Sequence, residues 1–159
     1  MSDSFSHLND RGEARMVDVT AKAVTERSAT ARCRVLVSRE VAQRLLAGDM
    51  PKGDALAVAR VAAIQATKRT PDLIPLCHPI AIHGVDVGIT VEEAGSVAIL
   101  VTVRTADRTG IEMEALTAAA VGGLTVIDMV KGVDRQAHIA EVVLLEKTGG
   151  RSGTWRRES

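Results

Sequence analysis

The chain has 159 residues, with 20 basic and 20 acidic side chains and a formal net charge of zero. This length predicts one domain with a proper core, and the balanced charge gives no general attraction to nucleic acid or to an anionic membrane. With no Tyr, one Phe and one Trp, the chain lacks the aromatic surfaces on which RNA readers stack bases. Two cysteines are too few for a disulfide framework or a four-cysteine zinc site, and no signal-peptide pattern or membrane-spanning apolar run is expected. We therefore expect a cytoplasmic protein that binds neither nucleic acid nor membrane.

The first half of the chain predicts a strand followed by two helices. Residues 1–15 are polar and without a hydrophobic period, which indicates a flexible arm. Apolar and polar residues alternate from 29 to 37, the pattern of a half-buried strand. Two helices should follow, one from the N-cap Ser38 to Gly48 and an alanine-rich one from the N-cap Asp54 to about residue 68, before Pro71.

The second half predicts a connector, a hairpin, a long helix and a last strand. The segment 73–79 reads L-I-P-L-C-H-P, and its two prolines favour an extended or turned connector. Apolar residues alternate in 85–91 and again in 97–103, which is typical of a hairpin. An apolar helix over 110–131 and a strand through 139–145 complete the order β-α-α-β-β-α-β.

This order predicts an α+β fold. Without one extra helix it is the split βαβ pattern of a ferredoxin-like sandwich, a four-stranded antiparallel sheet with helices on one face. We expect a single catalytic domain over 16–147, preceded by the arm 1–15 and followed by a flexible Gly/Ser/Arg-rich tail over 148–159.

The long helix carries charge only near its ends. Acids in a first turn favour the helix N-terminus by about 0.3–1 kcal/mol, so a structural role explains Glu112 and Glu114 as well as a functional one. Asp128 lies in the last turn, where an anion opposes the macrodipole, and an exposed i,i+3 pair with Lys131 returns only about 0.2–0.5 kcal/mol. We therefore favour a functional role for Asp128.

The spacing of these charges limits how one ligand can reach them. Glu114 and Asp128 are fourteen residues apart, which is about 21 Å along a helix. Either the ligand is extended, like a nucleotide triphosphate, or a second subunit supplies one end of the site. We expect a site between subunits.

Other candidates are weaker by themselves. Cys77 and His78 are too few for a zinc site, but the prolines around them fix the imidazole, which is a fair donor to an anion. Gly122 and Gly123 indicate either a ligand or a close helix crossing. The segment 147–153 could close over phosphates, or it could be a loose end.

Several motifs together point to a known family. The segments M-V-D-V, L-I-P-L-C-H-P, G-I-E-M-E-A-L-T, D-M-V-K and K-T-G-G-R-S-G occur in this order, and from Gly12 to Gly153 the chain resembles the molybdenum-cofactor biosynthesis protein C family, the cyclic pyranopterin monophosphate synthases. The resemblance implies a lyase that converts 3′,8-cyclo-7,8-dihydro-GTP, made by a radical-SAM GTP cyclase, into cyclic pyranopterin monophosphate with release of pyrophosphate. It also implies a homohexamer, a trimer of dimers with active sites between subunits.

The resemblance assigns roles residue by residue. Its implied catalytic residues are Asp128, Lys131 and Lys52. Its implied substrate-binding residues are Leu76, Cys77, His78, Met113 and Glu114, supported by Glu112, Asp18 and Arg27. Asp128 and Lys131 would act as base and acid while the purine-derived ring opens, and Lys52 and Arg27 would stabilise the departing pyrophosphate. The family implies no resident metal or cofactor, although Mg²⁺ could accompany the triphosphate.

Two other classes of function remain open. A non-catalytic nucleotide sensor would use the same fold and the same phosphate-binding cations, because fold does not define function. A sensor would have no need of an acid–base pair such as Asp128 and Lys131. A purely structural oligomer would leave the charged helix ends without a purpose.

Overall fold

A computed structural model describes residues 7–158 of the chain, so the first six residues of the predicted N-terminal arm lie outside the described residues. In chain order the elements are β1 (Thr25–Leu36), α1 (Arg39–Ala47), α2 (Ala55–Thr67), α3 (Thr70–Leu73), β2 (Gly84–Glu92), β3 (Ser96–Asp107), α4 (Glu112–Val130), β4 (His138–Thr148) and β5 (Trp155–Arg156).

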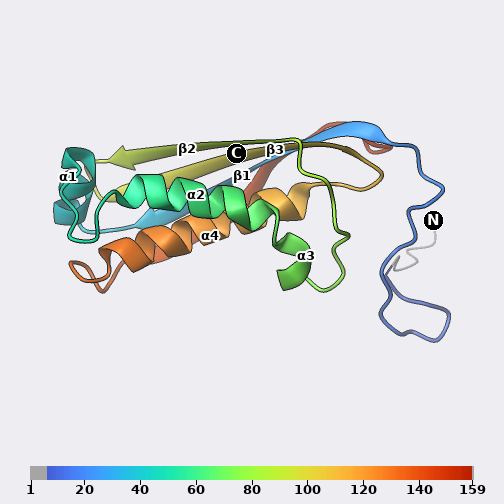
Figure 1. Cartoon of the computed structure of the whole chain (residues 1–159), viewed down its shortest axis with the longest axis horizontal. Helices are drawn as coiled ribbons and strands as arrows, with labels where there is room; N and C mark the ends of the chain where they lie inside the picture. The colour runs from blue at the N-terminus through green and yellow to red at the C-terminus, as the bar shows by residue number, and fades with distance from the viewer. Residues whose placement is uncertain (1–6, 159) are drawn as a thin grey trace.

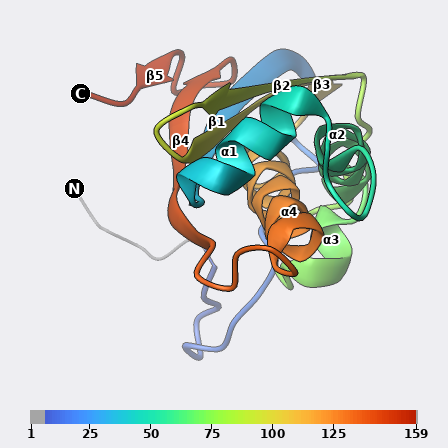
Figure 2. The ribbon, with the colours of Figure 1, turned by 90° about the vertical axis from the view of Figure 1, so that its left-hand side faces the viewer.

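The strands form one antiparallel sheet in the order β2-β3-β1-β4-β5. Helices α2 and α4 lie side by side against one face of this sheet (Figures 1 and 2). The predicted α+β, ferredoxin-like arrangement is confirmed. Beyond the predicted elements, the structure has the single-turn helix α3 and the two-residue edge strand β5, which pairs with β4 at Glu146 and Lys147. The predicted flexibility of residues 7–15 and 148–158 stays a prediction.

The alternating pattern explains which strand residues form the core. On β1 the side chains of Ala29, Ala31, Cys33 and Val35 are all at most 1% exposed, and they face the helices. On β3 the same alternation buries Val97, Ile99, Val101 and Val103 completely. A side-chain period of two therefore gives the central strands one apolar face.

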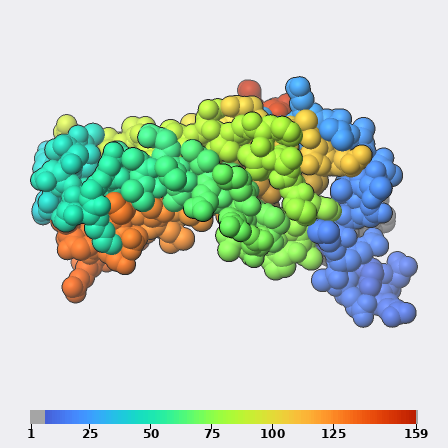
Figure 3. Space-filling model, viewed as in Figure 1, coloured from blue at the N-terminus to red at the C-terminus, as the bar shows by residue number. Residues whose placement is uncertain are grey.

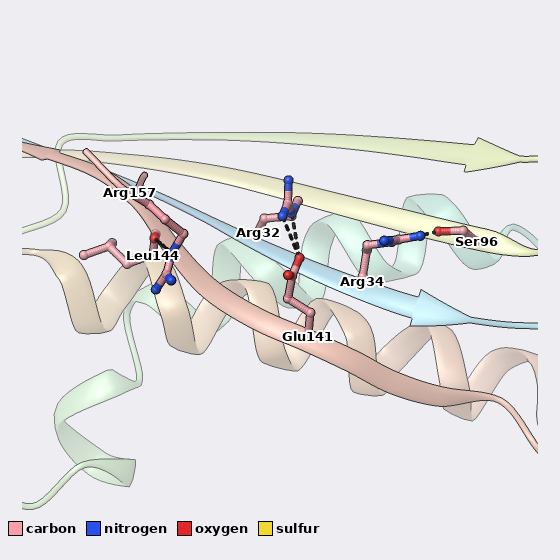
Figure 4. Close-up of polar contacts among 6 residues, drawn as sticks. All are labelled: Arg32, Arg34, Ser96, Glu141, Leu144 and Arg157. Carbon is pink, nitrogen blue, oxygen red and sulfur yellow. Dashed lines mark hydrogen bonds and ion pairs between the residues drawn. The ribbon is translucent and has the colours of Figure 1, made fainter. Parts of the chain in front are cut away.

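The opposite face of the sheet carries polar contacts between strands, shown in Figure 4. Arg32 forms an ion pair with Glu141 of β4 at 2.7 Å, and Arg34 donates a 3.4 Å hydrogen bond to Ser96 of β3. Nearer the C-terminus, Arg157 donates to the main-chain oxygen of Leu144 at 2.8 Å.

The caps predicted for the first two helices are present. Ser38 Oγ accepts a hydrogen bond from the Val41 amide, and Gly48 ends α1 in the left-handed region at φ 70°. Asp54 Oδ1 accepts from the Ala57 amide at 2.9 Å. Pro71 follows α2 as predicted, but it lies in the first turn of α3, where a proline is tolerated because its missing N–H would have no partner.

Small residues bring α4 close to its neighbours. A Cβ at Gly122 would lie 3.3 Å from the Ile99 side chain, and a Cβ at Gly123 would lie 2.5 Å from Cys33 Sγ. A Cβ at Gly122 would also lie 3.5 Å from the Ala63 Cβ of α2. The two glycines therefore let α4 pack closely against the sheet and against the alanine-rich helix α2, and a close helix crossing was one of the two explanations that the sequence left open.

Helix α4 is long and apolar enough to cross a membrane by length and composition alone. More than half of its most apolar stretch is buried inside the fold. Its apolar character is therefore that of a core helix.

Candidate active site

Helix α4 separates two groups of candidate residues. Its N-terminus lies beside the connector between α3 and β2, and its C-terminus lies at the opposite end of the molecule, near the loop that precedes α2 (Figure 1). Glu114 and Asp128 both belong to this one uninterrupted helix, so about 21 Å of helix separates them. Within one chain the two groups form separate sites.

The first group surrounds a cavity of about 420 Å³, here called the α4 N-terminal cavity. Its walls come from the loop before β1, the connector and the first turn of α4. It is lined by His7, Val17, Val19, Lys22, Leu76, Cys77, His78, Ile80, Thr109, Gly110, Glu112, Met113 and Glu114. Six of the eight predicted substrate-binding residues are therefore brought together, although they come from two segments more than thirty positions apart.

Glu114 has the most unusual environment in this cavity. The residue is only 1% exposed, and its Oε1 has no hydrogen-bond partner among the described residues. Burial is the main cause that raises the pKa of Glu114 to about 7; a backbone hydrogen bond opposes the shift, and the nearby charge of Glu112 adds to it. Near neutral pH this carboxyl group can therefore hold or release a proton.

Cys77 lies beside this carboxyl group. Burial raises the pKa of the Cys77 thiol, and the negative charge of Glu114 adds to the effect. The thiol thus stays protonated at neutral pH. A nucleophilic cysteine needs the opposite surroundings, which lower its pKa.

His78 ties the connector to the loop before β1. Its Nε2 lies 2.7 Å from the main-chain oxygen of Val17, and since a carbonyl only accepts, Nε2 carries the proton. Asp18 follows directly; it is exposed and does not line the cavity. Hydrogen bonds from Thr20 lower the pKa of Asp18, and the charge of His78 contributes to the lowering.

Arg27 lies outside the α4 N-terminal cavity. Its Nε donates to the main-chain oxygen of Asp107 at 3.0 Å, and its Nη2 donates to that of Arg108 at 3.2 Å. These bonds hold the guanidinium group at the wall of a neighbouring cavity.

The second group is a carboxylate between two ammonium groups at the end of α4. Asp128 Oδ1 lies 2.7 Å from Lys131 Nζ, and Asp128 Oδ2 lies 3.3 Å from Lys52 Nζ. Lys52 also donates to the main-chain oxygen of Asp128 at 2.7 Å. Hydrogen bonds from Lys131 and then from Lys52 lower the pKa of Asp128. All three predicted catalytic residues are therefore in contact.

This cluster is open to solvent in a single chain. The side chains of Lys52, Asp128 and Lys131 are 44%, 57% and 59% exposed. The i,i+3 pair with Lys131, which was the structural explanation for Asp128, is present. The additional contact with Lys52, from a loop 76 positions away, is more than that explanation requires.

Sequence reasoning missed some of the residues around these sites. Lys22 and Thr109 line the α4 N-terminal cavity. By contrast, Lys147 belongs to the segment 147–153 that the sequence already singled out, and it forms a 2.7 Å ion pair with Glu112 at the edge of the cavity. Lys22 and Thr109 lie in loops outside any motif used above, so the sequence offers no signal for them. Across residues 7–158 no cluster of three or more His, Cys, Asp or Glu side chains could hold a metal ion.

A ferredoxin-like fold with a cavity beside a titratable carboxyl group, and a carboxylate–ammonium cluster elsewhere, is the arrangement of an enzyme that acts on a small molecule. Comparison with known proteins narrows this class. Residues 16–150 match the model of the MoaC family. The chain therefore belongs to the MoaC family, and the resemblance seen in the sequence is confirmed.

Curated relatives match the chain over nearly its whole length. A cyclic pyranopterin monophosphate synthase from Streptomyces avermitilis is 57% identical, over 98% of this chain and 91% of the relative. The synthase from a Nocardioides species is 56% identical over 99% of each chain, and that from Geobacter metallireducens is 52% identical over 98% of each.

Proposed function

We propose that the chain forms cyclic pyranopterin monophosphate, the activity for which its relatives are named, in the biosynthesis of the molybdenum cofactor. The substrate is the 3′,8-cyclised dihydro-GTP, and pyrophosphate is the second product. The observation that carries this proposal is that six predicted substrate-binding residues from two distant segments line one cavity.

The phosphate chemistry of this reaction balances without an oxidant or a reductant. A substrate hydroxyl attacks the α-phosphorus and forms the cyclic ester, while the bond from that phosphorus to the oxygen bridging to the β-phosphate breaks. Pyrophosphate leaves with the bonding electron pair, and the hydroxyl proton passes to a base. The protein therefore has to supply proton transfer and cations for the leaving group.

The residues proposed for these tasks are those that the family resemblance implies. Asp128 is the proposed base and Lys131 the proposed acid, in contact at 2.7 Å. Lys52 and Arg27 are proposed to stabilise the negative charge of the departing pyrophosphate. The carboxyl group of Glu114, with its pKa near 7, is proposed to bind the pterin-forming part of the substrate. No resident cofactor takes part in this scheme, and any Mg²⁺ enters with the triphosphate.

We further propose that one active site is built from two copies of the chain. Lys52, Asp128 and Lys131 of one protomer would then face the α4 N-terminal cavity of the next, within a homohexamer made of three dimers. The support is the helix length between the two groups and the half-exposed state of the cluster in one chain. The substrate would be supplied in the cytoplasm by a radical-SAM GTP cyclase.

The test replaces Asp128 without disturbing the fold. Asp128→Asn should lower the rate of pyrophosphate release from the cyclised GTP substrate by about a hundredfold or more, because general acid–base catalysis is lost. A matched control is Asp72→Asn, which removes the carboxylate of another exposed i,i+3 ion pair, with Arg69 at 3.3 Å. The control should keep the full rate, and an Asp128→Asn protein as active as the control would refute the assigned role.

A further inference from the structure

The turn that follows α4 is held by hydrogen bonds to the end of the helix. Lys131, which caps the C-terminal end of α4, donates its amide to the main-chain oxygen of Ile127 at 2.9 Å. The amides of Val133 and Asp134 both donate to the main-chain oxygen of Val130, at 2.8 and 2.9 Å. Lys131 therefore lies in a continuous hydrogen-bonded turn that ends at Asp134.

The carboxylate of Asp134 links this turn to the start of α1. Its Oδ2 accepts a hydrogen bond from the Ser38 amide at 2.7 Å, and its Oδ1 accepts one from the Gln136 amide at 2.9 Å. Within residues 7–158, Asp134 belongs to no ion pair, so these two amides are the partners of its carboxylate. Helices α1 and α4 pack little against each other directly. The bond from Ser38 to Asp134 therefore ties α1 to the end of α4, at one end of the molecule (Figure 1).

Helix α1 in turn determines where the loop that carries Lys52 begins. The Asp49 amide donates to the main-chain oxygen of Arg44 at 2.9 Å, and Arg44 Nε donates to the main-chain oxygen of Asp49 at 2.9 Å. Met50 is buried, and its main-chain oxygen accepts the Gly53 amide at 3.0 Å. The loop is therefore a braced extension of α1, and a shift of α1 would carry Lys52 with it.

The two lysines beside Asp128 depend on this main-chain frame. The side chains of Lys52 and Lys131 are 44% and 59% exposed, and an exposed ion pair contributes too little to hold two long side chains in one geometry. The positions of their main chains therefore decide whether both ammonium groups reach Asp128. Asp134 bears on both positions, because it ends the turn after Lys131 and holds the helix that leads to Lys52.

We propose that Asp134 is a positioning residue for the reaction, which holds α1 and the end of α4 in the placement that brings Lys131 and Lys52 to opposite oxygens of Asp128. This inference rests on the proposed function, in which these three residues transfer a proton and stabilise the leaving group. Within residues 7–158 the Asp134 carboxylate forms no hydrogen bond with any of the three, so it acts through the main chain.

The kinetic test compares two changes at Asp134 with a change at Ser38. Asp134→Ala removes both acceptor oxygens and should lower kcat for pyrophosphate release about tenfold or more with little change in KM, because small displacements of catalytic groups slow the chemical step. Asp134→Asn keeps one acceptor oxygen and should give an intermediate kcat. The matched control is Ser38→Ala, which removes the Oγ cap of α1 but keeps the amide that donates to Asp134. The control should therefore keep the natural kcat.

A second measurement does not depend on turnover. Hydrogen bonds from Lys131 and then from Lys52 lower the pKa of Asp128. When the lysines move away in Asp134→Ala, the pKa of Asp128 should rise towards the ordinary value for an aspartate. Carboxyl-carbon NMR of the assembled protein at several pH values measures this pKa, which should be unchanged in Ser38→Ala.

Each outcome decides the proposal. A lower kcat and a higher pKa of Asp128 in Asp134→Ala, both absent from Ser38→Ala, would support it. An unchanged kcat or an unchanged pKa of Asp128 in Asp134→Ala would overturn it, as would equal changes in the Ser38→Ala control, which would indicate a merely structural role. If the natural chain released no pyrophosphate, the proposed function would fail, and the NMR titration would still decide whether Asp134 positions the two lysines.

Discussion

At the first turn of α4, two glutamates two positions apart lie in opposite environments. Glu112 is ion-paired with Lys147 at 2.7 Å, whereas Glu114 is buried and one of its oxygens has no hydrogen-bond partner within residues 7–158. Residues i and i+2 face different sides of a helix. The sequence could identify both as candidate residues, but it could not predict which one is buried, because that depends on the connector that covers Glu114.

The burial of Glu114 predicts a particular dependence of stability on pH. Its pKa of about 7 in the folded chain exceeds the ordinary value of 4.5. The folded state therefore holds a proton that the unfolded state releases, so the free energy of unfolding falls as pH rises from about 4.5 to about 7. Over this pH range, Glu114 lowers the free energy of unfolding by an amount on the order of 3 kcal/mol. Glu114→Gln should remove it, and urea unfolding at several pH values measures the difference.

An exposed acid provides the control for this measurement. Glu40 lies exposed in the first turn of α1, and Glu40→Gln should retain the pH dependence of the natural chain. If Glu114→Gln and the natural chain lose stability equally between pH 5 and pH 7, then Glu114 ionises normally and the raised pKa is wrong.

At the scale of elements, the contact between α4 and the sheet depends on Gly123. Gly123→Ala would bring a methyl group 2.5 Å from Cys33 Sγ and 3.2 Å from the Ile139 side chain. Overpacking lowers the free energy of unfolding by about 1–3 kcal/mol. The higher helix propensity of alanine offsets only about 1 kcal/mol of this loss. We expect a lower free energy of unfolding, measured by urea denaturation.

Two further variants test this explanation. Gly122→Ala would place its methyl group 3.3 Å from Ile99, a milder contact, so its effect should be close to neutral. Adding Cys33→Ala to Gly123→Ala removes the sulfur that the new methyl group meets, and the two changes should be less harmful together than their sum. Strict additivity would show that another contact causes the loss.

The elements that the sequence predicts are those with a local cause. Alternation defines β1 and β3, and Ser38 and Asp54 mark helix starts through their own side chains. Helix α3 is a single turn, too short for a hydrophobic period, and β5 has two residues whose strand conformation depends on pairing with β4. Such elements follow from tertiary contacts, which a local pattern does not contain.

The same distinction applies to the candidate sites. The family motifs identify Leu76 to His78 and Met113 to Glu114, and the fold joins them in one cavity. The neighbouring cavity at Arg27 unites Lys22, Arg27, Arg108 and Arg151, which come from three separate parts of the chain. No spacing rule links these residues, so only the folded arrangement groups them.

At the scale of the whole molecule, a site between subunits makes a prediction about mixed assemblies. A Glu114→Ala protein and an Asp128→Asn protein should each be inactive, since each lacks one half of every site. After they are unfolded and refolded together in equal amounts, about a quarter of the sites should combine two intact halves. The rate of pyrophosphate release should then recover to about that fraction of the natural rate.

A second mixture shows whether this recovery has the proposed cause. His78 and Glu114 line the same cavity of one chain, so mixing His78→Ala with Glu114→Ala leaves no site with two intact halves. That mixture should stay inactive. Recovery in both mixtures, or in neither, would contradict a site divided between two chains.

Because α4 is one uninterrupted helix joining both groups of candidate residues (Figure 1), its length also fixes their relative direction. In the space-filling view, the orange segment near the end of α4 lies at one end of the molecule and the blue N-terminal segment at the other (Figure 3). One inserted or deleted residue in its middle would turn the C-terminal half by about 100° and shift it by about 1.5 Å. Asp128 would then point away from its lysine partner in the loop, even if every side chain were retained. Insertions and deletions between homologous chains should accordingly be confined to loops and termini, and be absent between residues 114 and 128.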